Sequence, residues 1–170
     1  MAGRRDGEQA IRARLYKERI VLTQLRRLGQ ATKQDLAAAT GIPVQTVVDI
    51  VNGLERDGLV RALGRRLGRV GQPSIVYAID PDGVFALGLH VRRGVQELAL
   101  VDFEGRIRTR LVREHALPHF EPVRDFLVEG LASVVRDGTP AARVSGVGVS
   151  LSHDLWYRPD RQGLPADVLA

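Results

Sequence analysis

A pair of short helical segments, separated by a glycine and a proline, constrains the fold of this chain more than any other stretch. The pair occupies residues 32–59, TKQDLAAATGIPVQTVVDIVNGLERDGL. Thr32 can cap the first helix through its hydroxyl, and Asp35, three residues later, completes a weak capping box. Gly41 suits the left-handed backbone that ends a helix, and Pro43 suits the first position of the next one. The stretch therefore predicts two helices joined by a tight turn.

Apolar side chains at helical spacing divide this pair into a buried face and an outward face. The residues expected in the core are Leu36, Ala37, Ala39, Val47, Ile50, Val51 and Leu54. The residues left on or near the outward side of the second helix are Val44, Gln45, Thr46, Val48 and Asp49. Glutamine can pair with adenine, and threonine or valine can touch a thymine methyl group, so this side suits a DNA major groove. An ordinary helical hairpin with a solvated face is the alternative.

A glycine- and arginine-rich segment follows the pair. Residues 59–63 and 75–79 are rich in branched side chains and are predicted to form the strands of a β-hairpin. Glycines between them allow close backbone approach, and arginines favour phosphates and a narrow minor groove. The position directly after two helices favours the wing of a winged helix-turn-helix over a merely solvated hairpin. The candidate DNA contacts outside the second helix are Thr32, Lys33, Arg65, Arg66, Arg69 and Gln72.

A long helix is predicted over residues 11–28, ended by Gly29. The leucines expected to pack it against the helical pair are Leu15, Leu22, Leu25 and Leu28. Its arginines and its lysine could meet phosphates, although most of them are expected to form a solvated face. Residues 1–10 are small and polar, and we expect them to be disordered.

The charge of the chain is unevenly distributed. Residues 1–79 hold 14 Lys and Arg against 7 Asp and Glu, whereas residues 80–170 hold 11 against 13, which together give the net charge of +5. A basic first half suggests a nucleic-acid module joined to another domain. The chain has no cysteine, which excludes disulfides and thiolate metal sites. No apolar run approaches the roughly 18 residues of a membrane span, so we expect a cytoplasmic protein without membrane contact.

The second half of the chain has a different pattern, which begins after the turn at residues 80–83. Strands are predicted over residues 84–91, 95–103 and 107–115, and a helix over residues 121–136. The run VSGVGVSL at residues 144–151 is typical of a buried parallel strand. This β-β-β-α-β order is that of the opening of a ribonuclease H-like, actin-like ATPase fold. The sequence thus predicts disordered residues 1–10, a DNA-binding domain over 11–80 and a second domain over 84–170.

These motifs together resemble the ROK family of repressors and sugar kinases. The resemblance is carried by the helical pair, the hairpin, LGLHVRRGVQELALVDFEGRI at residues 87–107 and GVGVSL at residues 146–151. It implies an α+β winged helix-turn-helix domain followed by a partial α/β ribonuclease H-like domain, which we expect to be truncated. The family's regulators usually carry Gly-Arg-Pro in the wing. This chain has Gln72 between Gly71 and Pro73, so Gln72, Arg69 or Arg65 would have to enter the minor groove.

The implied function is that of a sequence-specific regulator of transcription. It would be a repressor linked to carbohydrate metabolism, a homodimer on double-stranded DNA that responds to a sugar or sugar phosphate. The family's glycine strand lies near its sugar site, so Gly148, Ser150 and His153 are the candidate effector contacts. A Ser150–His153–Asp154 hydrolase triad is disfavoured, because the three residues are close only along a strand end and loop.

A sugar kinase of the same family is the enzyme alternative. Such kinases carry Asp-x-Gly-Gly-Thr, whose aspartate attends the metal and phosphates of ATP. Here His90 stands at the aspartate position, where a histidine cannot replace a carboxylate that holds Mg²⁺. Arg92 stands at the next glycine, where its side chain would block the approach of the backbone to a phosphate. We therefore expect no enzyme activity and no cofactor. A third alternative is a DNA-binding protein that senses no ligand.

Overall fold

The computed structural model describes residues 2–66, 73–115 and 120–153. It divides the chain into two compact units. The first comprises Met1–Val84 with Asp102–Arg106, and the second comprises Phe85–Val101 with Ile107–Ala170. Each unit has its own hydrophobic core, and each is described by itself below.

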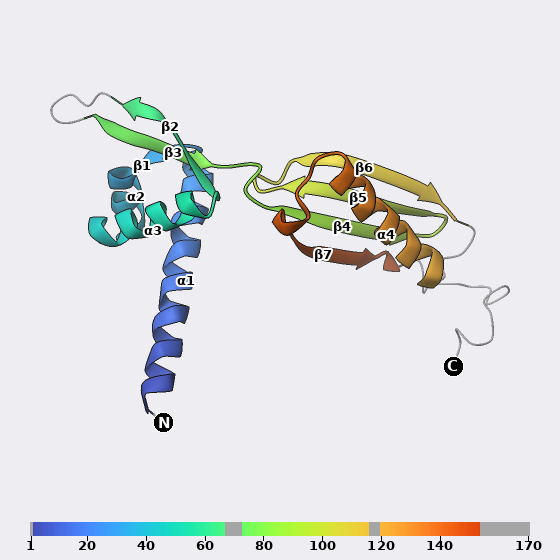
Figure 1. Cartoon of the computed structure of the whole chain (residues 1–170), viewed down its shortest axis with the longest axis horizontal. Coiled ribbons are helices and arrows are strands. Elements are labelled where there is room, and N and C mark those ends of the chain that lie inside the picture. Colours follow the sequence, from blue (N-terminus) through green and yellow to red (C-terminus); the bar gives the residue numbers. More distant parts are fainter. Residues whose placement is uncertain (1, 67–72, 116–119, 154–170) are drawn as a thin grey trace. The chain divides into compact units, whose positions relative to one another are not determined.

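The first unit combines three helices with a small sheet (Figure 1). Its elements in chain order are α1 (Ala2–Leu28), β1 (Ala31–Thr32), α2 (Lys33–Thr40), α3 (Val44–Arg56), β2 (Val60–Arg66) and β3 (Ser74–Ile79). The sheet has the order β1-β3-β2, and β3 is antiparallel to both of its neighbours. The hairpin predicted from the branched runs is thus confirmed. The two-residue strand β1 was not predicted.

The start of α2 has the predicted capping box. The Thr32 hydroxyl accepts a hydrogen bond from the Asp35 amide at 3.1 Å, and the Asp35 carboxylate accepts one from the Thr32 amide at 2.9 Å. Gly41, at φ 70°, ends the helix in the left-handed conformation. Pro43 lies at the N-cap of α3 and not inside it. The difference is small, because a proline also suits a position whose amide has no helical partner.

The core of the first unit lies where α1, α2, α3 and the sheet meet. Leu36, Val47 and Val51 are fully buried there, together with Val21 and Leu25 of α1. Burial of each such side chain contributes about 1.5–3 kcal/mol. All the predicted core positions of α3 are buried, but the prediction for Ala39 is wrong, because this residue of α2 is exposed.

Helix α1 is longer than predicted. It begins at Ala2, so the expected disorder of residues 1–10 is wrong for residues 2–10. Leu25 packs into the core and Leu22 lies against it, whereas Leu15 and Leu28 are 58% and 45% exposed. The N-terminal part of the helix extends past the other elements of its own unit (Figure 1).

The second unit is a four-stranded sheet with one long helix. Its elements are β4 (Phe85–Arg92), β5 (Val95–Asp102), β6 (Ile107–Glu114), α4 (Phe120–Arg136), a short 3₁₀ helix (Ala141–Arg143) and β7 (Val144–Leu151). The sheet order is β6-β5-β4-β7, with β7 parallel to β4 and β5 antiparallel to β6. The predicted β-β-β-α-β order is therefore present.

Helix α4 covers one face of this sheet through Phe126, Gly130 and Val134, which are all buried. The helix approaches so closely at Gly130 that a Cβ atom there would overlap the side chain of Leu98. On β4 the residues facing α4 are buried, and they alternate with more accessible ones. The sheet therefore has an apolar face under α4 and a second face that carries polar side chains.

The prediction of a buried strand at residues 144–151 is only half right. Strand β7 is parallel to β4, but Val147, Val149 and Leu151 are 44%, 58% and 53% exposed. The reason is topological, because β7 lies at the edge of the sheet and α4 packs against β4 and β6.

Candidate nucleic-acid interface

The outer side of α3 presents a row of polar side chains. Gln45, Asp49, Asn52 and Arg56 are exposed and recur at a spacing of three or four residues, which places them on one face. Among the other candidates from the sequence, Val44 is 49% exposed, and Thr46 and Val48 are half-buried beside this face. Asn52 and Arg56 were missed, although an extension of the same helical spacing would have found them.

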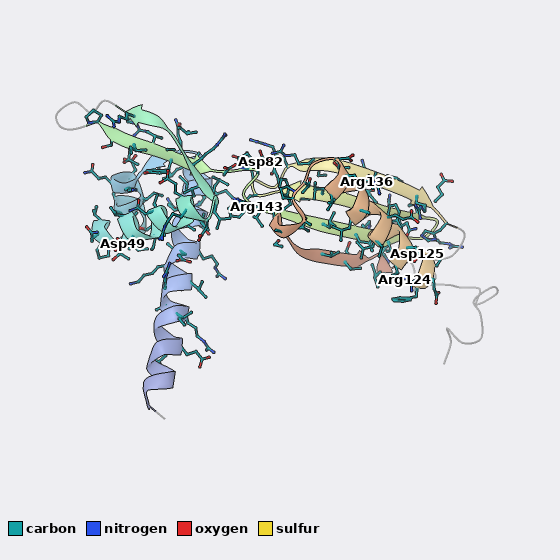
Figure 2. The ribbon with its side chains drawn as sticks, viewed as in Figure 1. Asp49, Asp82, Arg124, Asp125, Arg136 and Arg143 are labelled. Atoms are coloured by element: carbon teal, nitrogen blue, oxygen red, sulfur yellow. The ribbon has the colours of Figure 1, made fainter. Side chains whose placement is uncertain are left out.

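Gln45 and Asp49 are neighbours on this row. The Gln45 side-chain nitrogen lies 3.5 Å from an oxygen of Asp49 (Asp49 is labelled in Figure 2). A carboxylate repels phosphates, but it can accept a hydrogen bond from the amino group of cytosine. The row therefore begins with an amide, Gln45, followed by an acid, Asp49, and ends with a cation, Arg56.

A groove of about 270 Å³ separates α3 from the sheet. The residues that line it include Val44 and Val48 of α3, Lys33 of α2, and Ile75 and Tyr77 of β3. Two apolar side chains of the helix thus face two side chains of the hairpin. Methyl-sized surfaces of this kind suit contact with a thymine methyl group.

Lys33 is held at the rim of this groove by two contacts. Its ammonium group donates a hydrogen bond to the Asn52 side chain at 2.6 Å and lies 5.0 Å from the centre of the Tyr77 ring. The lysine therefore places a positive charge directly beside the polar row of α3. Thr32 lies next to it in sequence but has a different position. Its side chain is buried, its hydroxyl caps α2, and it forms part of the wall of the same groove.

The hairpin adds further cations at the end of β2. Arg65 and Arg66 are exposed, and Arg66 forms an ion pair with Asp35 at 3.2 Å. The hydrogen bond from the Thr32 amide lowers the pKa of the Asp35 carboxyl, and Arg66 lowers it further. Arg69 and Gln72, the two remaining wing candidates, lie outside the described residues.

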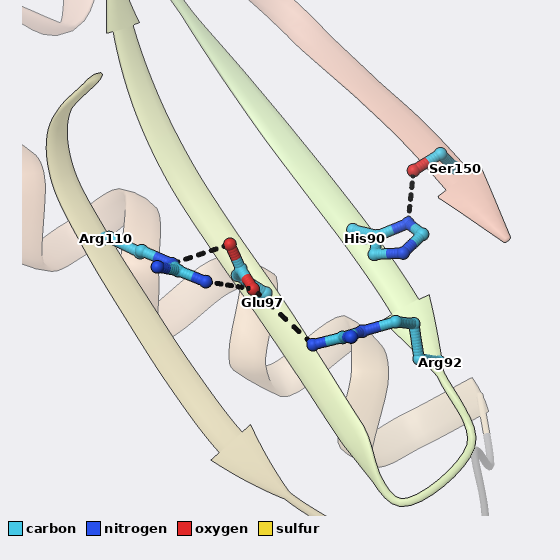
Figure 3. Close-up of polar contacts among 5 residues, drawn as sticks. All are labelled: His90, Arg92, Glu97, Arg110 and Ser150. Carbon is cyan, nitrogen blue, oxygen red and sulfur yellow. Dashed lines mark hydrogen bonds and ion pairs between the residues drawn. The ribbon is translucent and has the colours of Figure 1, made fainter. Parts of the chain in front are cut away.

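The second unit brings two of the predicted effector residues to one place. Gly148 and Ser150 of β7 lie opposite Gly88 and His90 of β4 in the parallel register. The Ser150 hydroxyl and the His90 Nδ1 atom are 2.6 Å apart (Figure 3). The third candidate, His153, is exposed beyond the end of β7 and does not line the same hollow.

This hollow measures about 330 Å³, and Glu97 of β5 also lines it. Glu97 accepts two hydrogen bonds from Arg110, at 2.7 and 2.9 Å, and lies 3.9 Å from Arg92 (Figure 3). Arg110 is the main reason why the pKa of Glu97 is lowered, and Arg92 contributes to it. The floor beside this carboxylate consists of Gly88 and Gly148, so the backbone there is accessible. His90 and Glu97 were not predicted as parts of a site, because a strand register cannot be deduced from local sequence.

The described part of the chain has neither a cluster of metal-binding side chains nor a membrane-spanning helix. No group of three or more histidine and acidic side chains there is arranged to hold a metal ion. No helix among these residues has the length and apolar character needed to cross a membrane.

Comparison with known proteins finds a likeness of fold. No family model matches the sequence, and the search of curated proteins finds no significant match. The chain is similar to the crystal structure of a ROK family transcriptional regulator, a homologue of the E. coli MLC protein. The TM-score is 0.51 and the identity 14%, over 79% of this chain and 35% of that one.

The chain therefore spans about a third of the length of that regulator. A structure described as prokaryotic transcription factors gives a TM-score of 0.28 at 14% identity, over 82% of this chain and 95% of that one. A likeness at 14% identity concerns the fold. Over the aligned region, this chain has the mixed α and β fold of a ROK family transcriptional regulator.

Proposed function

We propose that the first unit is a winged helix-turn-helix that binds double-stranded DNA sequence-specifically, and that the protein regulates transcription. In this proposal α2 and α3 are the helix-turn-helix, α3 is the recognition helix and the β2–β3 hairpin is the wing. The observation that carries it is the exposed polar row of α3, flanked by Lys33 and by Arg66 of the hairpin.

The chemistry of the row supports reading of base edges. Gln45 can contact adenine, and Asp49 can accept a hydrogen bond from cytosine, each such pairing contributing about 1–3 kcal/mol of discrimination. Val44 and Val48 offer apolar contact on the hairpin side of α3. Lys33, Arg65 and Arg66 would contact phosphates, which fixes position on the duplex without reading sequence. Arg69 and Gln72 remain candidates for the tip of the wing.

The regulator would act as a homodimer, with two recognition helices in successive major grooves about 34 Å apart. We further propose that the second unit has a ribonuclease H-like fold of the ROK type, and that the protein is a repressor. Its effector would be a sugar or sugar phosphate bound in the hollow lined by Gly148 and Ser150. An effector can shift DNA affinity only if it binds two arrangements of the protein with different affinities.

The sugar-kinase alternative has less support. At the position where the kinases carry their metal-binding aspartate, His90 is engaged with Ser150, and Arg92 lies beside Glu97. Two basic side chains thus stand where ATP chemistry requires a carboxylate and a glycine backbone. We therefore propose a regulator that does not turn over ATP.

The test combines selection and binding. Duplexes enriched by the protein from a random pool are compared with scrambled duplexes of equal length by fluorescence anisotropy. We expect preferential binding of the enriched sequence, and loss of about tenfold or more in preference for Gln45→Ala, since one specific contact is worth about 1–3 kcal/mol. Gln30→Ala, the same substitution at an exposed residue outside α3, is the matched control. Equal binding to both duplexes would contradict sequence-specific recognition.

A further inference from the structure

A second groove runs along the opposite side of α3, between this helix and α1. Its volume is about 400 Å³, and it is lined by residues from both helices: Ala13, Arg14, Lys17, Thr46, Asp49, Ile50 and Arg56. We infer that this groove binds a backbone phosphate of the DNA strand that borders the major groove on the α1 side. The inference rests on the proposed DNA-binding function and adds a contact made by α1.

Two guanidinium groups converge in this region. A Cβ atom on Gly53 would lie 3.8 Å from Arg14 Nη2 and 3.9 Å from Arg56 Nη2, so both groups extend over the same glycine from different helices. Like charges that approach this closely repel one another unless an anion lies near them.

The positive charge of the groove is only partly neutralised within the protein. Arg14 donates a hydrogen bond to Glu18 at 2.8 Å, and this carboxylate is the main reason why the pKa of Arg14 is raised. Arg56 donates to a backbone carbonyl, that of Asn52. Neither Lys17 nor Arg56 has an ion-pair partner among the described residues. Asp57 raises the pKa of Arg14 further, and one acid, Asp49, lies on the groove wall toward the base-reading row.

The position of the groove identifies the anion. Thr46 and Asp49 line it and also belong to the part of α3 that would face bases. Lys33, beside Asn52, lies on the hairpin side of the same helix, whereas Lys17 lies on the α1 side. Cations thus stand on both flanks of α3, as the phosphates of two strands stand on both sides of a major groove about 12 Å wide. A backbone phosphate therefore fits better than a free anion.

Arg19 of helix α1 is the control position for Lys17. Arg19 lies two residues after Lys17 in the same helix, which places it about half a turn away on the other side of α1; it is exposed and does not line the groove. Lys17→Gln and Arg19→Gln remove the same charge from one helix. They would have equal effects if only the net charge of α1 mattered, and unequal effects if the groove holds a phosphate.

The experiment measures the affinity for the enriched duplex at several salt concentrations. Each phosphate contact contributes about 0.9 to the slope of log K against log salt concentration. We expect Lys17→Gln and Arg56→Gln each to lower this slope by about 0.9 and to weaken binding to enriched and scrambled duplexes by the same factor. Arg19→Gln should change the slope by less than half as much.

Two results would overturn the inference. Equal slopes for Lys17→Gln and Arg19→Gln, in a protein that still prefers the enriched duplex, would reject the groove while the proposed function stands. A wild-type protein that shows no preference between duplexes would reject the proposed function and the groove with it. Circular dichroism of each variant confirms that its helices are intact.

Discussion

The side chains of Gln45 and Asp49 lie one helical turn apart on α3, with the Gln45 nitrogen 3.5 Å from a carboxylate oxygen of Asp49. The carboxylate therefore orients the amide, because a Gln side chain that donates to a neighbour has its oxygen turned away from it. It also places a negative charge in the middle of the surface proposed to face DNA. The Asp49 carboxylate should therefore lower the affinity for DNA in general and raise the selectivity for one sequence.

Asp49→Asn is expected to separate the two effects. Loss of the negative charge should strengthen binding to every duplex. An Asn amide keeps one acceptor oxygen but lacks the charge that strengthens the hydrogen bond from Gln45, so the preference for the enriched sequence should fall by about tenfold, equivalent to about 1.4 kcal/mol. Anisotropy titrations on enriched and scrambled duplexes measure both. The control is Glu55→Gln, which removes the same charge from another exposed position of α3. An unchanged preference in Asp49→Asn would show that Asp49 does not orient Gln45.

The capping box of α2 gives a prediction for stability. Thr32→Ala removes the hydroxyl that accepts from the Asp35 amide, which should lower the free energy of unfolding by about 0.5–2 kcal/mol. Urea unfolding followed by circular dichroism measures it. Thr23→Ala is the control, since that hydroxyl bonds a carbonyl within α1 and caps nothing. Equal losses in the two variants would argue against a special role of the cap.

Asp35 gives a pH dependence with a definite sign. Its pKa is lowered in the folded protein, chiefly by the hydrogen bond from the Thr32 amide. The ionised carboxylate therefore stabilises the fold above the unfolded pKa of about 3.9, and this contribution is lost as the pH falls from there through the folded pKa. Wild type should lose stability more steeply than Asp35→Asn below about pH 4. Parallel curves for the two proteins would contradict this.

Two helical glycines should respond in opposite directions to alanine. At Gly53 a Cβ atom would meet its nearest neighbours at 3.8 and 3.9 Å, an ordinary contact, so Gly53→Ala should stabilise α3 by about 0.5–1 kcal/mol. At Gly130 the same atom would overlap Leu98, so Gly130→Ala should destabilise the second unit by about 1–3 kcal/mol. Thermal unfolding measures both. Recovery in Gly130→Ala with Leu98→Ala would identify the overlap as the cause.

Ser150→Ala tests the proposed effector hollow. This substitution removes the hydroxyl that contacts His90 at 2.6 Å. A sugar or sugar phosphate that raises the melting temperature of the wild-type protein should have a smaller effect on the variant. His153→Ala, outside the hollow, should respond like the wild type. The reverse ranking of the two variants would place the effector elsewhere.

Local chemistry explains which features of the fold were predictable. The capping box at Thr32 and Asp35, the end of α2 at Gly41 and the buried face of α3 depend on neighbours within one or two turns. The exposure of Leu15 and of Val149 does not, because it depends on which faces of their elements other elements cover. The sequence of a single helix or strand does not specify how other elements pack against it.

The residues of the candidate site were likewise predictable only where local spacing determines their position. Gln45 and Asp49 were identified from helical spacing, and they are exposed on one face of α3. Lys17 was predicted among mostly solvated charges, whereas it lines a groove with residues of α3. Its neighbours come from a segment about thirty residues away, and His90 meets Ser150 across a separation of 60 residues. Such pairs follow from packing and register, which local patterns do not specify.

Thr32 has one further consequence for recognition. It pairs with Val76 of the hairpin in β1 and also caps α2. One residue thus joins the sheet to the helical pair, and Lys33 links α2 with α3 and Tyr77 immediately after it. The described base of the hairpin and α3 are therefore preorganised with respect to each other. Less conformational entropy is lost when both meet the same duplex, so more of the contact energy remains as affinity.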